Sequence, residues 1–115
     1  MPRRKDTDLV EDIRQAIGRI RRYTRRLSYE EFLRDTMVQD AVVRNLEIIG
    51  EAAKGFSAGF RKKHKTIRWR DIAGMRDRLI HHYAGVNWSI VWDVIRTKLP
   101  GLGRQLAALS ESGER

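Results

Sequence analysis

Apolar residues recur at helical spacing along most of the chain and predict a series of amphipathic helices. The first helix begins near residues 6–8, where acids suit a helix N-terminus, and its apolar positions three, four and seven apart continue to Leu27. Ser28 and Glu31 have the spacing of a capping box, in which each side chain satisfies a free backbone donor of the other residue. The capping box predicts that a second, short helix follows it.

The longest apolar stripe predicts a helix from about residue 35 to residue 56, and only Asn45 interrupts it. A stripe this wide needs partners on two sides, so we expect this helix at the centre of a bundle or at a dimer interface. Gly50 lies within the helix, where glycine lowers helix stability unless it allows another backbone to come close.

The second half of the chain predicts further helices separated by breaks. Residues 57–68 contain Gly and Ser and then become strongly basic, which favours a surface loop. A helix starting at Trp69 is expected to continue to about Tyr83, before Gly85 breaks it. Asn87 is a suitable cap for the next helix, and Pro100 either ends that helix or opens a final one around residues 102–109. No alternating strand pattern is present, so the fold class is all-α.

The length of 115 residues predicts one domain, residues 1–115, with residues 1–5 as a flexible basic arm and residues 110–115 as a flexible polar tail. The absence of cysteine excludes disulfides and thiolate metal sites and suits a cytoplasmic protein. No apolar run is long enough to cross a bilayer, so no membrane association is expected.

The net charge of +9 comes from clustered basic residues and indicates an anionic partner. Nucleic acid is the favoured class, and the alternative is a solubilising surface that suits an acidic partner protein. Two stretches without any acid carry the charge. They contain Arg14, Arg19, Arg21, Arg22, Arg25 and Arg26, and then Arg61, Lys62, Lys63, Lys65, Arg68 and Arg70.

Residues with candidate chemistry occur together near residue 80, where Arg76, His81 and Tyr83 spell R-x4-H-x-Y. Histidine can act as base or acid near neutral pH, and arginine offers a permanently charged fork to phosphate oxygens. On one straight helix, positions five apart lie about 140° around and about 7.5 Å along the axis. Arg76 and His81 of one subunit therefore do not form a tight pair unless the helix ends or bends between them.

This motif, together with the segment 49–53 and Trp92, resembles the HepT-like family of the HEPN superfamily, over roughly residues 9–106. The resemblance implies an all-α, HEPN-type bundle of four to six helices that works as a homodimer, with both R-x4-H segments facing one cleft. It implies a metal-independent endoribonuclease that is the toxin of a toxin–antitoxin module. It also implies an MNT-type nucleotidyltransferase antitoxin that transfers AMP onto the motif tyrosine, here Tyr83. Position 77 is Asp where many members of the family carry Asn.

We therefore expect Arg76 to bind phosphate and His81 to act as acid and base, each supplied twice by a dimer. Asp77 and Glu51 either orient these side chains or are plain surface acids. Tyr83 is the expected modification site, or else it only anchors the end of the helix. No metal site and no cofactor are expected, because His64 has no carboxylate near it. The residues expected to contact RNA are Arg78, His82, Arg61, Lys62, Lys63 and Lys65.

Trp69, Trp88 and Trp92 fall on apolar faces, so we expect them in the core or in a dimer interface, not as stacking platforms for bases. The alternative to a ribonuclease is a non-catalytic dimeric module that binds the nucleotidyltransferase or nucleic acid. A DNA-binding regulator that uses the first basic helix has less support, since no recognition-helix turn pattern is present.

Overall fold

The chain forms a bundle of helices with one very small β-hairpin. The structure is a computed structural model that describes residues 4–81 and 85–111. These residues form six helical stretches, counting α6, η1 and α7 as one, which confirms the predicted all-α class. The helices are α1 (Asp6–Thr24), α2 (Tyr29–Arg34), α3 (Thr36–Lys54), α4 (Ala58–Lys63), α5 (Trp69–Leu79), α6 (Trp88–Asp93), the π-helical η1 (Val94–Lys98) and α7 (Leu99–Glu111), and the strands are β1 (Ile80–His81) and β2 (Gly85–Val86).

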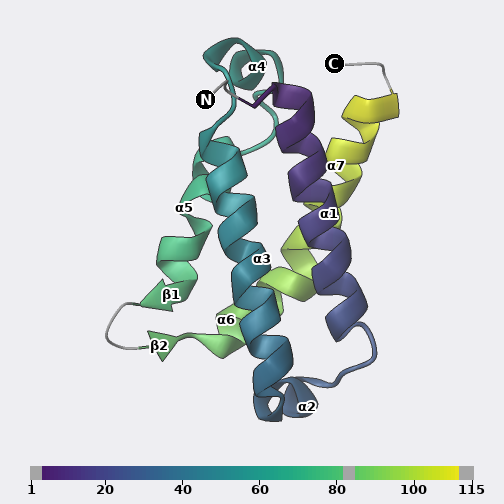
Figure 1. Cartoon of the computed structure of the whole chain (residues 1–115), viewed down its shortest axis with the longest axis vertical. Helices are drawn as coiled ribbons and strands as arrows, with labels where there is room; N and C mark the ends of the chain where they lie inside the picture. Colours follow the sequence, from purple (N-terminus) through teal and green to yellow (C-terminus); the bar gives the residue numbers. More distant parts are fainter. Residues whose placement is uncertain (1–3, 82–84, 112–115) are drawn as a thin grey trace.

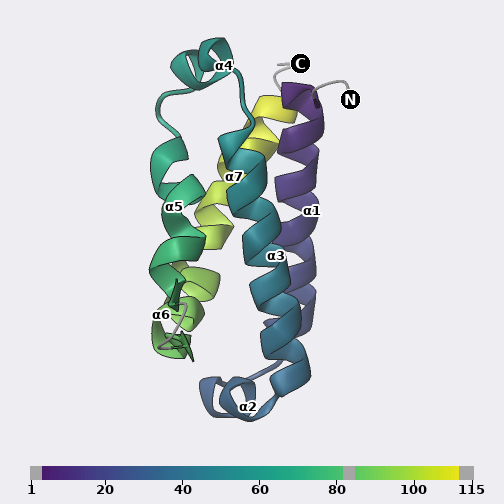
Figure 2. The same cartoon turned by 60° about the vertical axis from the view of Figure 1, so that its left-hand side comes forward.

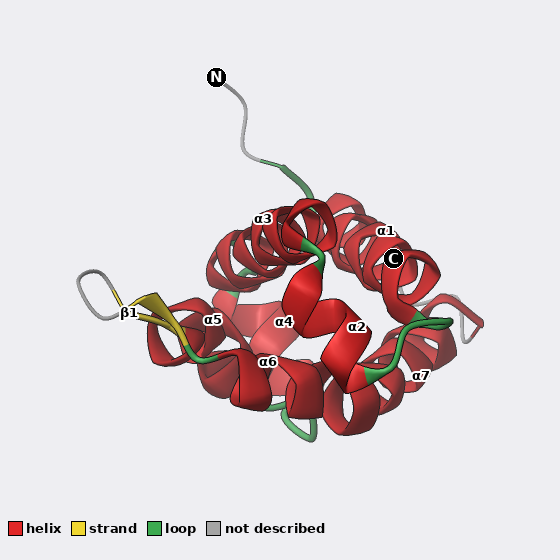
Figure 3. Ribbon diagram, turned by 90° about the horizontal axis from the view of Figure 1, so that it is seen from below, coloured by secondary structure: helices red, strands yellow, loops and turns green. Residues whose placement is uncertain are grey.

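Helix α3 lies between α1 and α5 and packs against α1 on one side and α5 on the other (Figures 1 and 2). Seen along the bundle, α3, α1, α7, α6 and α5 surround one core, and β1 projects on the side of α5, away from α1 and α7 (Figure 3). The partners on two sides that the wide apolar stripe predicted are confirmed. None of the described helices is both long enough and apolar enough to cross a membrane.

The core is built from the apolar faces of these helices. Ile13 and Ile20 of α1, Leu46 of α3 and Phe32 of α2 are fully buried there. Asn45, which interrupts the stripe of α3, is also buried, and its side chain is satisfied at both ends. Its Oδ1 accepts from Arg19 Nε at 2.8 Å, and its Nδ2 donates to the Ala41 carbonyl at 2.8 Å. A buried amide with both partners fixes how α1 faces α3 without leaving an uncompensated polar group.

The predicted surface loop over residues 57–68 is wrong in its first half, because α4 forms there. The Ser57 hydroxyl caps this helix by accepting from Phe60 N–H at 3.1 Å. Ser57 itself is held by the Asp6 carboxylate, which accepts from its backbone N–H at 2.9 Å and from its hydroxyl at 2.7 Å. Phe60 stacks on Phe56 with ring centroids 4.9 Å apart. The cap and the ring contact stabilise a helix that propensity alone did not predict.

The helix from Trp69 was also predicted too long, since α5 ends at Leu79 instead of Tyr83. The chain turns at once into the hairpin, in which Ile80 pairs with Val86 and His81 with Gly85 in antiparallel register. Asn87 N–H then donates to the Leu79 carbonyl at 3.1 Å. Ile80, the first residue after Leu79, is β-branched and favours an extended backbone. Gly85 supplies the positive φ of 83° that other residues rarely adopt.

The last helical stretch begins at the predicted cap, because Asn87 Oδ1 accepts from Ile90 N–H at 3.4 Å. Of the two predicted alternatives, Pro100 opens the next helix, since it is the second residue of α7. Proline has no N–H to donate to the carbonyl four residues earlier, and the preceding turn widens into the π-helix η1, where Leu99 N–H donates to the Val94 carbonyl. The helix continues to Glu111, so the expected tail begins later than residue 110.

Helix α1 ends at Thr24, earlier than Leu27, and a residue of η1 secures this end. Arg96 Nη2 donates to the Thr24 carbonyl at 3.2 Å and to the Leu27 carbonyl at 2.8 Å. The guanidinium also lies 4.3 Å from the centre of the Trp92 ring, and Trp92 in turn packs on Phe32. A cation at a helix C-terminus satisfies its last carbonyls and complements its dipole.

Candidate functional site

The R-x4-H motif spans the junction between α5 and β1. Arg76 lies in the last turn of α5, which ends at Leu79, and His81 lies in β1. The helix therefore ends between the two residues, which is the condition under which one subunit can bring them together. The side chain of His81 and the whole of His82 and Tyr83 lie outside the part of the chain that the structure describes. The modification site at Tyr83 and the RNA contact at His82 therefore stay predictions.

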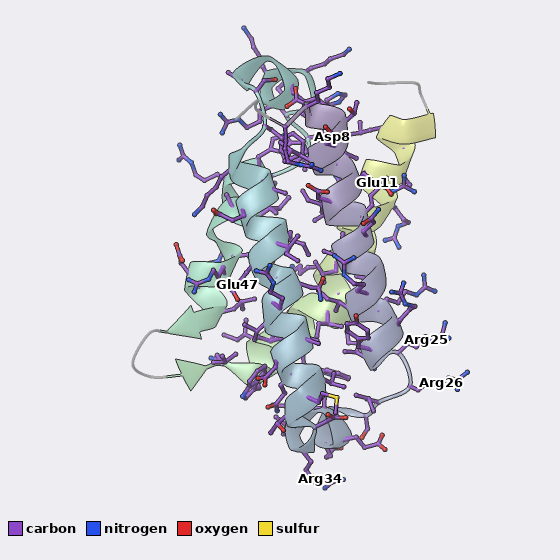
Figure 4. All side chains as sticks on the ribbon, viewed as in Figure 1. Asp8, Glu11, Arg25, Arg26, Arg34 and Glu47 are labelled. Carbon is purple, nitrogen blue, oxygen red and sulfur yellow. The ribbon has the colours of Figure 1, made fainter. Side chains whose placement is uncertain are left out.

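Arg76 is held by two acids. Its Nε lies 3.2 Å from Glu47 Oε2 on α3, and its Nη1 lies 3.5 Å from Asp77 Oδ1. Both the Arg76 and the Glu47 side chains are partly exposed, at 41% and 36%. Within the described residues, Nη2 of Arg76 has no hydrogen-bond partner, so it can donate to a phosphate oxygen. Figure 4 shows Glu47 on the side of α3 that faces α5.

Helices α3 and α5 pass close to each other at Gly50. A Cβ at this position would lie 3.5 Å from the Ala73 carbonyl oxygen and 3.8 Å from the Arg76 Cβ. The backbone of α5 therefore lies close to Gly50, but both distances are ordinary van der Waals contacts, so alanine would also fit at this position. Glu47 lies one helical turn before Gly50, so it occupies the same face of α3.

Sequence reasoning missed Glu47 as a partner of Arg76 and named Glu51 instead. The carboxylate of Glu51 is exposed and lies 3.9 Å from Lys54 Nζ. No contact between Glu51 and Arg76 occurs among the described residues. The signal that could have identified Glu47 is its spacing from Gly50, which marks the face of α3 that meets α5.

Arg78, an expected RNA contact, folds back along its own helix. Its Nη2 donates to the Asp71 carbonyl at 2.8 Å, and the side chain is exposed. Arg78 therefore lies on the solvent-exposed side of α5, two residues after Arg76 in the sequence.

The basic cluster of Arg61, Lys62, Lys63 and Lys65 lies at the opposite end of α5 from His81 (Figure 1). All four side chains are exposed. Helix α5 has 11 residues, which corresponds to about 16 Å at 1.5 Å per residue. An RNA that contacts both the basic cluster and the R-x4-H segment must therefore extend along the whole of α5.

The tryptophans lie where the apolar faces predicted. Trp69 is buried, and its ring centroid lies 4.6 Å from that of Phe56. Trp88 and Trp92 are partly buried and pack on Phe32 from two sides. His64 lies against Phe60 with ring centroids 4.6 Å apart. In residues 4–81 and 85–111, no three His, Cys, Asp or Glu side chains come together as a metal site would require.

Comparison with known proteins identifies the family to which the chain is similar. The family model described as "Ribonuclease HepT-like" matches residues 13–109. The chain is 44% identical over 100 residues to a protein of Thermococcus cleftensis named "Probable ribonuclease HepT", covering 87% of this chain and 91% of that protein.

Two further relatives carry the name "Putative RNase". The one from Caldanaerobacter subterraneus is 49% identical over 80 residues, which cover 70% of this chain and 71% of the relative. The one from Methanocaldococcus jannaschii is 39% identical over 100 residues, which cover 87% and 83%. No solved structure matches the chain.

Proposed function

Since the chain belongs to the ribonuclease HepT-like family, we propose that it is a metal-independent endoribonuclease that cleaves RNA with Arg76 and His81. The observation that supports the proposal is the end of α5 between these residues, together with the anchoring of Arg76 by Glu47 and Asp77. Two copies of the chain supply two arginines and two histidines to one shared cleft.

The proposed reaction is an internal transfer at phosphorus. One His81 removes the proton from a ribose 2′-OH, and the 2′-oxygen attacks the adjacent phosphorus. The bond from phosphorus to the 5′-oxygen breaks, and the His81 of the second copy gives a proton to that leaving oxygen. The products are a 2′,3′-cyclic phosphate and a free 5′-OH. One neutral and one protonated imidazole are needed at once, which two histidines can provide near neutral pH.

Arg76 stabilises the negative charge that develops on the phosphoryl oxygens. The contacts of Glu47 with Nε and of Asp77 with Nη1 hold the guanidinium in place before the substrate arrives. A donor that is already oriented does not have to reorganise in the transition state, which makes such groups effective. Asp77 and Glu47 are positioning residues in this scheme.

The test is RNA cleavage in EDTA by the wild type, Arg76→Ala and His81→Ala, with each protein sized in solution. Cleavage by the wild type alone, with all three proteins folded and dimeric, supports the proposal. A folded, dimeric His81→Ala that cleaves as fast as the wild type would disprove it. If no protein cleaves and the wild type carries no modification, the chain is a non-catalytic dimeric module.

We further propose that the protein is the toxin of a two-gene module and that an MNT-type nucleotidyltransferase neutralises it by transferring AMP from ATP to Tyr83. The tyrosine oxygen attacks the α-phosphorus of ATP, and pyrophosphate leaves. Tyr83 follows His81 by two residues, so the adduct would add bulk and negative charge next to the motif. The added charge would oppose the binding of RNA phosphates near Arg76.

This part of the proposal is tested by mass spectrometry of the protein expressed with and without the neighbouring nucleotidyltransferase gene. We expect a mass increase of one AMP on the peptide that contains Tyr83, together with loss of cleavage. The Tyr83→Phe variant should keep its mass and remain active when it is coexpressed with the nucleotidyltransferase. Full neutralisation of unmodified Tyr83→Phe would show that binding alone inactivates the enzyme.

A further inference from the structure

An arginine-rimmed groove runs between α1 and the η1–α7 stretch, on the opposite side of the bundle from β1 (Figure 3). Its volume is about 650 Å³. Arg21 lines it from α1, Arg25 lines it from the position directly after α1, and Arg104 lines it from α7. Figure 4 shows Arg25 at the C-terminal end of α1, pointing away from the bundle core. The groove is separate from Arg76 and His81, which lie in α5 and β1.

The three arginines are not used in the fold. Among the described residues, none of Arg21, Arg25 and Arg104 makes a side-chain hydrogen bond or an ion pair, and no acid lines the groove. Two other arginines that line the groove differ: Arg96 caps the end of α1, and Arg14 lies 3.7 Å from Glu11 Oε2. Three uncompensated guanidiniums around one concave surface create a strong positive potential.

The floor of the groove is apolar. Ile17 and Ile20 form it from α1, and Ile95 and Leu99 form it from the η1–α7 stretch. The two helices are in contact at Gly103, where a Cβ would lie 3.7 Å from Ile17 Cγ2.

We propose that this groove binds an acidic amphipathic helix of a protein partner. The apolar floor accepts a row of apolar side chains, and the arginine rim accepts the acids that flank them, as in other helix-in-groove complexes. The groove follows α1 from Arg14 to Arg25, which is about 16 Å and matches about three helical turns of a partner.

The same features disfavour single-stranded RNA as the occupant. Bases bind to such surfaces largely by stacking on aromatic rings. No aromatic side chain lines the groove within the described residues, and the nearby Trp92 ring is covered by Arg96. The Ile and Leu side chains of the floor carry no charge and no hydrogen-bond donor for a phosphate backbone.

The inference is tested with two synthetic 15-residue peptides that share one composition of Leu, Glu and Ala. In the first peptide the leucines form one face of a helix with glutamates on both sides, and in the second they are dispersed around the helix. Binding to the full chain is measured by fluorescence anisotropy at several salt concentrations. We expect the first peptide to bind at least about tenfold more tightly than the second, and its affinity to fall as salt rises.

Two pairs of variants locate the site. Arg21→Glu with Arg104→Glu should weaken binding of the first peptide at least about tenfold, whereas Lys62→Glu with Lys65→Glu, which changes the net charge equally, should weaken it by less than about threefold. Ala107→Phe fills the groove without changing the charge and should also weaken binding, whereas Ala108→Phe on the exposed neighbour should not. Because charge reversal can unfold a helix, circular dichroism of each variant is compared with that of the wild type. If the Arg21→Glu, Arg104→Glu variant does not fold, the peptide affinity of Ala107→Phe decides the question instead.

Equal binding of both peptides, or equal losses in the two double variants, would show general attraction to a basic protein and overturn the inference. The same proteins are tested with a fluorescent single-stranded RNA on a His81→Ala background. If the groove variants lose RNA binding and the peptide does not compete with RNA, the groove is an RNA surface and the inference is wrong. Arg21→Glu with Arg104→Glu should keep wild-type RNA cleavage, so failure here is distinguishable from failure of the proposed ribonuclease.

Discussion

Glu47 is expected to matter for RNA cleavage far more than for folding. Its carboxylate lies 3.2 Å from Arg76 Nε and is the contact that joins Arg76 to α3. Glu47→Gln keeps an oxygen that can accept from Nε but removes the charge, whereas Glu47→Ala removes both. The two variants therefore separate the hydrogen bond from the ion pair.

The size of each effect follows from the partial exposure of the pair. Ion pairs of this kind contribute about 0.2–1 kcal/mol to stability. Such a loss lowers the Tm by at most about 6 °C in a domain of this size. A hydrogen bond to a charged group is worth about 1 kcal/mol more than a neutral one, and about 1 kcal/mol in the transition state is about fivefold in rate. We expect kcat/KM to fall up to about fivefold for Glu47→Gln and up to about 30-fold for Glu47→Ala.

The assay is single-turnover RNA cleavage in EDTA across pH 5–9. Glu47 positions Arg76 and transfers no proton, so the rate should fall by the same factor at every pH. Asp40→Asn, which removes an exposed acid from the same helix, is the matched control and should cleave at the wild-type rate. The reasoning would be refuted if Arg76→Ala abolished cleavage while Glu47→Ala kept the wild-type rate. If Glu51→Gln lowered the cleavage rate and the Glu47 variants did not, Glu51 would be the acid that positions Arg76.

Three further predictions concern the elements around the site. Gly50→Ala should be tolerated, because its Cβ fits in van der Waals contact, whereas Gly50→Val should push α5 from α3, lower the Tm and weaken cleavage through Arg76. Gly85→Ala should cost about 1–2 kcal/mol in the free energy of unfolding measured with urea, since the φ of Gly85 is positive; an unchanged free energy would argue against the hairpin. The pKa of Glu31 lies below its ordinary value, because Ser28 N–H and then the Ser28 hydroxyl hydrogen-bond its carboxylate. The stabilisation of α2 by Glu31 is therefore full above the unfolded pKa and is lost as pH falls through the lower folded pKa. An NMR titration should show the Glu31 pKa rising part of the way towards its ordinary value in Ser28→Ala, because this variant removes the hydroxyl but keeps the backbone N–H. No change would mean that the hydroxyl does not contribute to the shift.

Local signals predicted much of the fold. Ser28 and Glu31 form the expected capping box, and Asn87 caps its helix through Ile90 N–H. These devices act within three residues, so the sequence contains both partners. The apolar stripe of α3 predicted its packing on two sides for the same reason, since burial follows directly from the spacing of apolar residues.

Contacts between distant residues could not be predicted in the same way. The cap of α4 depends on Asp6, 51 residues before Ser57, and the partner of Arg76 is 29 residues earlier in the chain. The end of α5 at Leu79 depends on pairing across the hairpin, which competes with helix only once Gly85 and Val86 lie alongside. Tertiary contacts such as these override the propensities on which the predicted boundaries rested.

The π turn of η1 sets the rotation of α7 about the helix axis relative to α6. Val91 of α6 and Leu106 of α7 are both fully buried, yet 15 residues at about 100° each would leave them roughly 60° apart on a uniform α-helix. A π turn holds more residues than an α turn and so absorbs this excess rotation. The five residues from Val94 to Lys98 thereby turn two short amphipathic segments into one continuous buried face. Removing a single residue there would rotate all of α7 about its own axis, and with it the wall that α7 presents to α1.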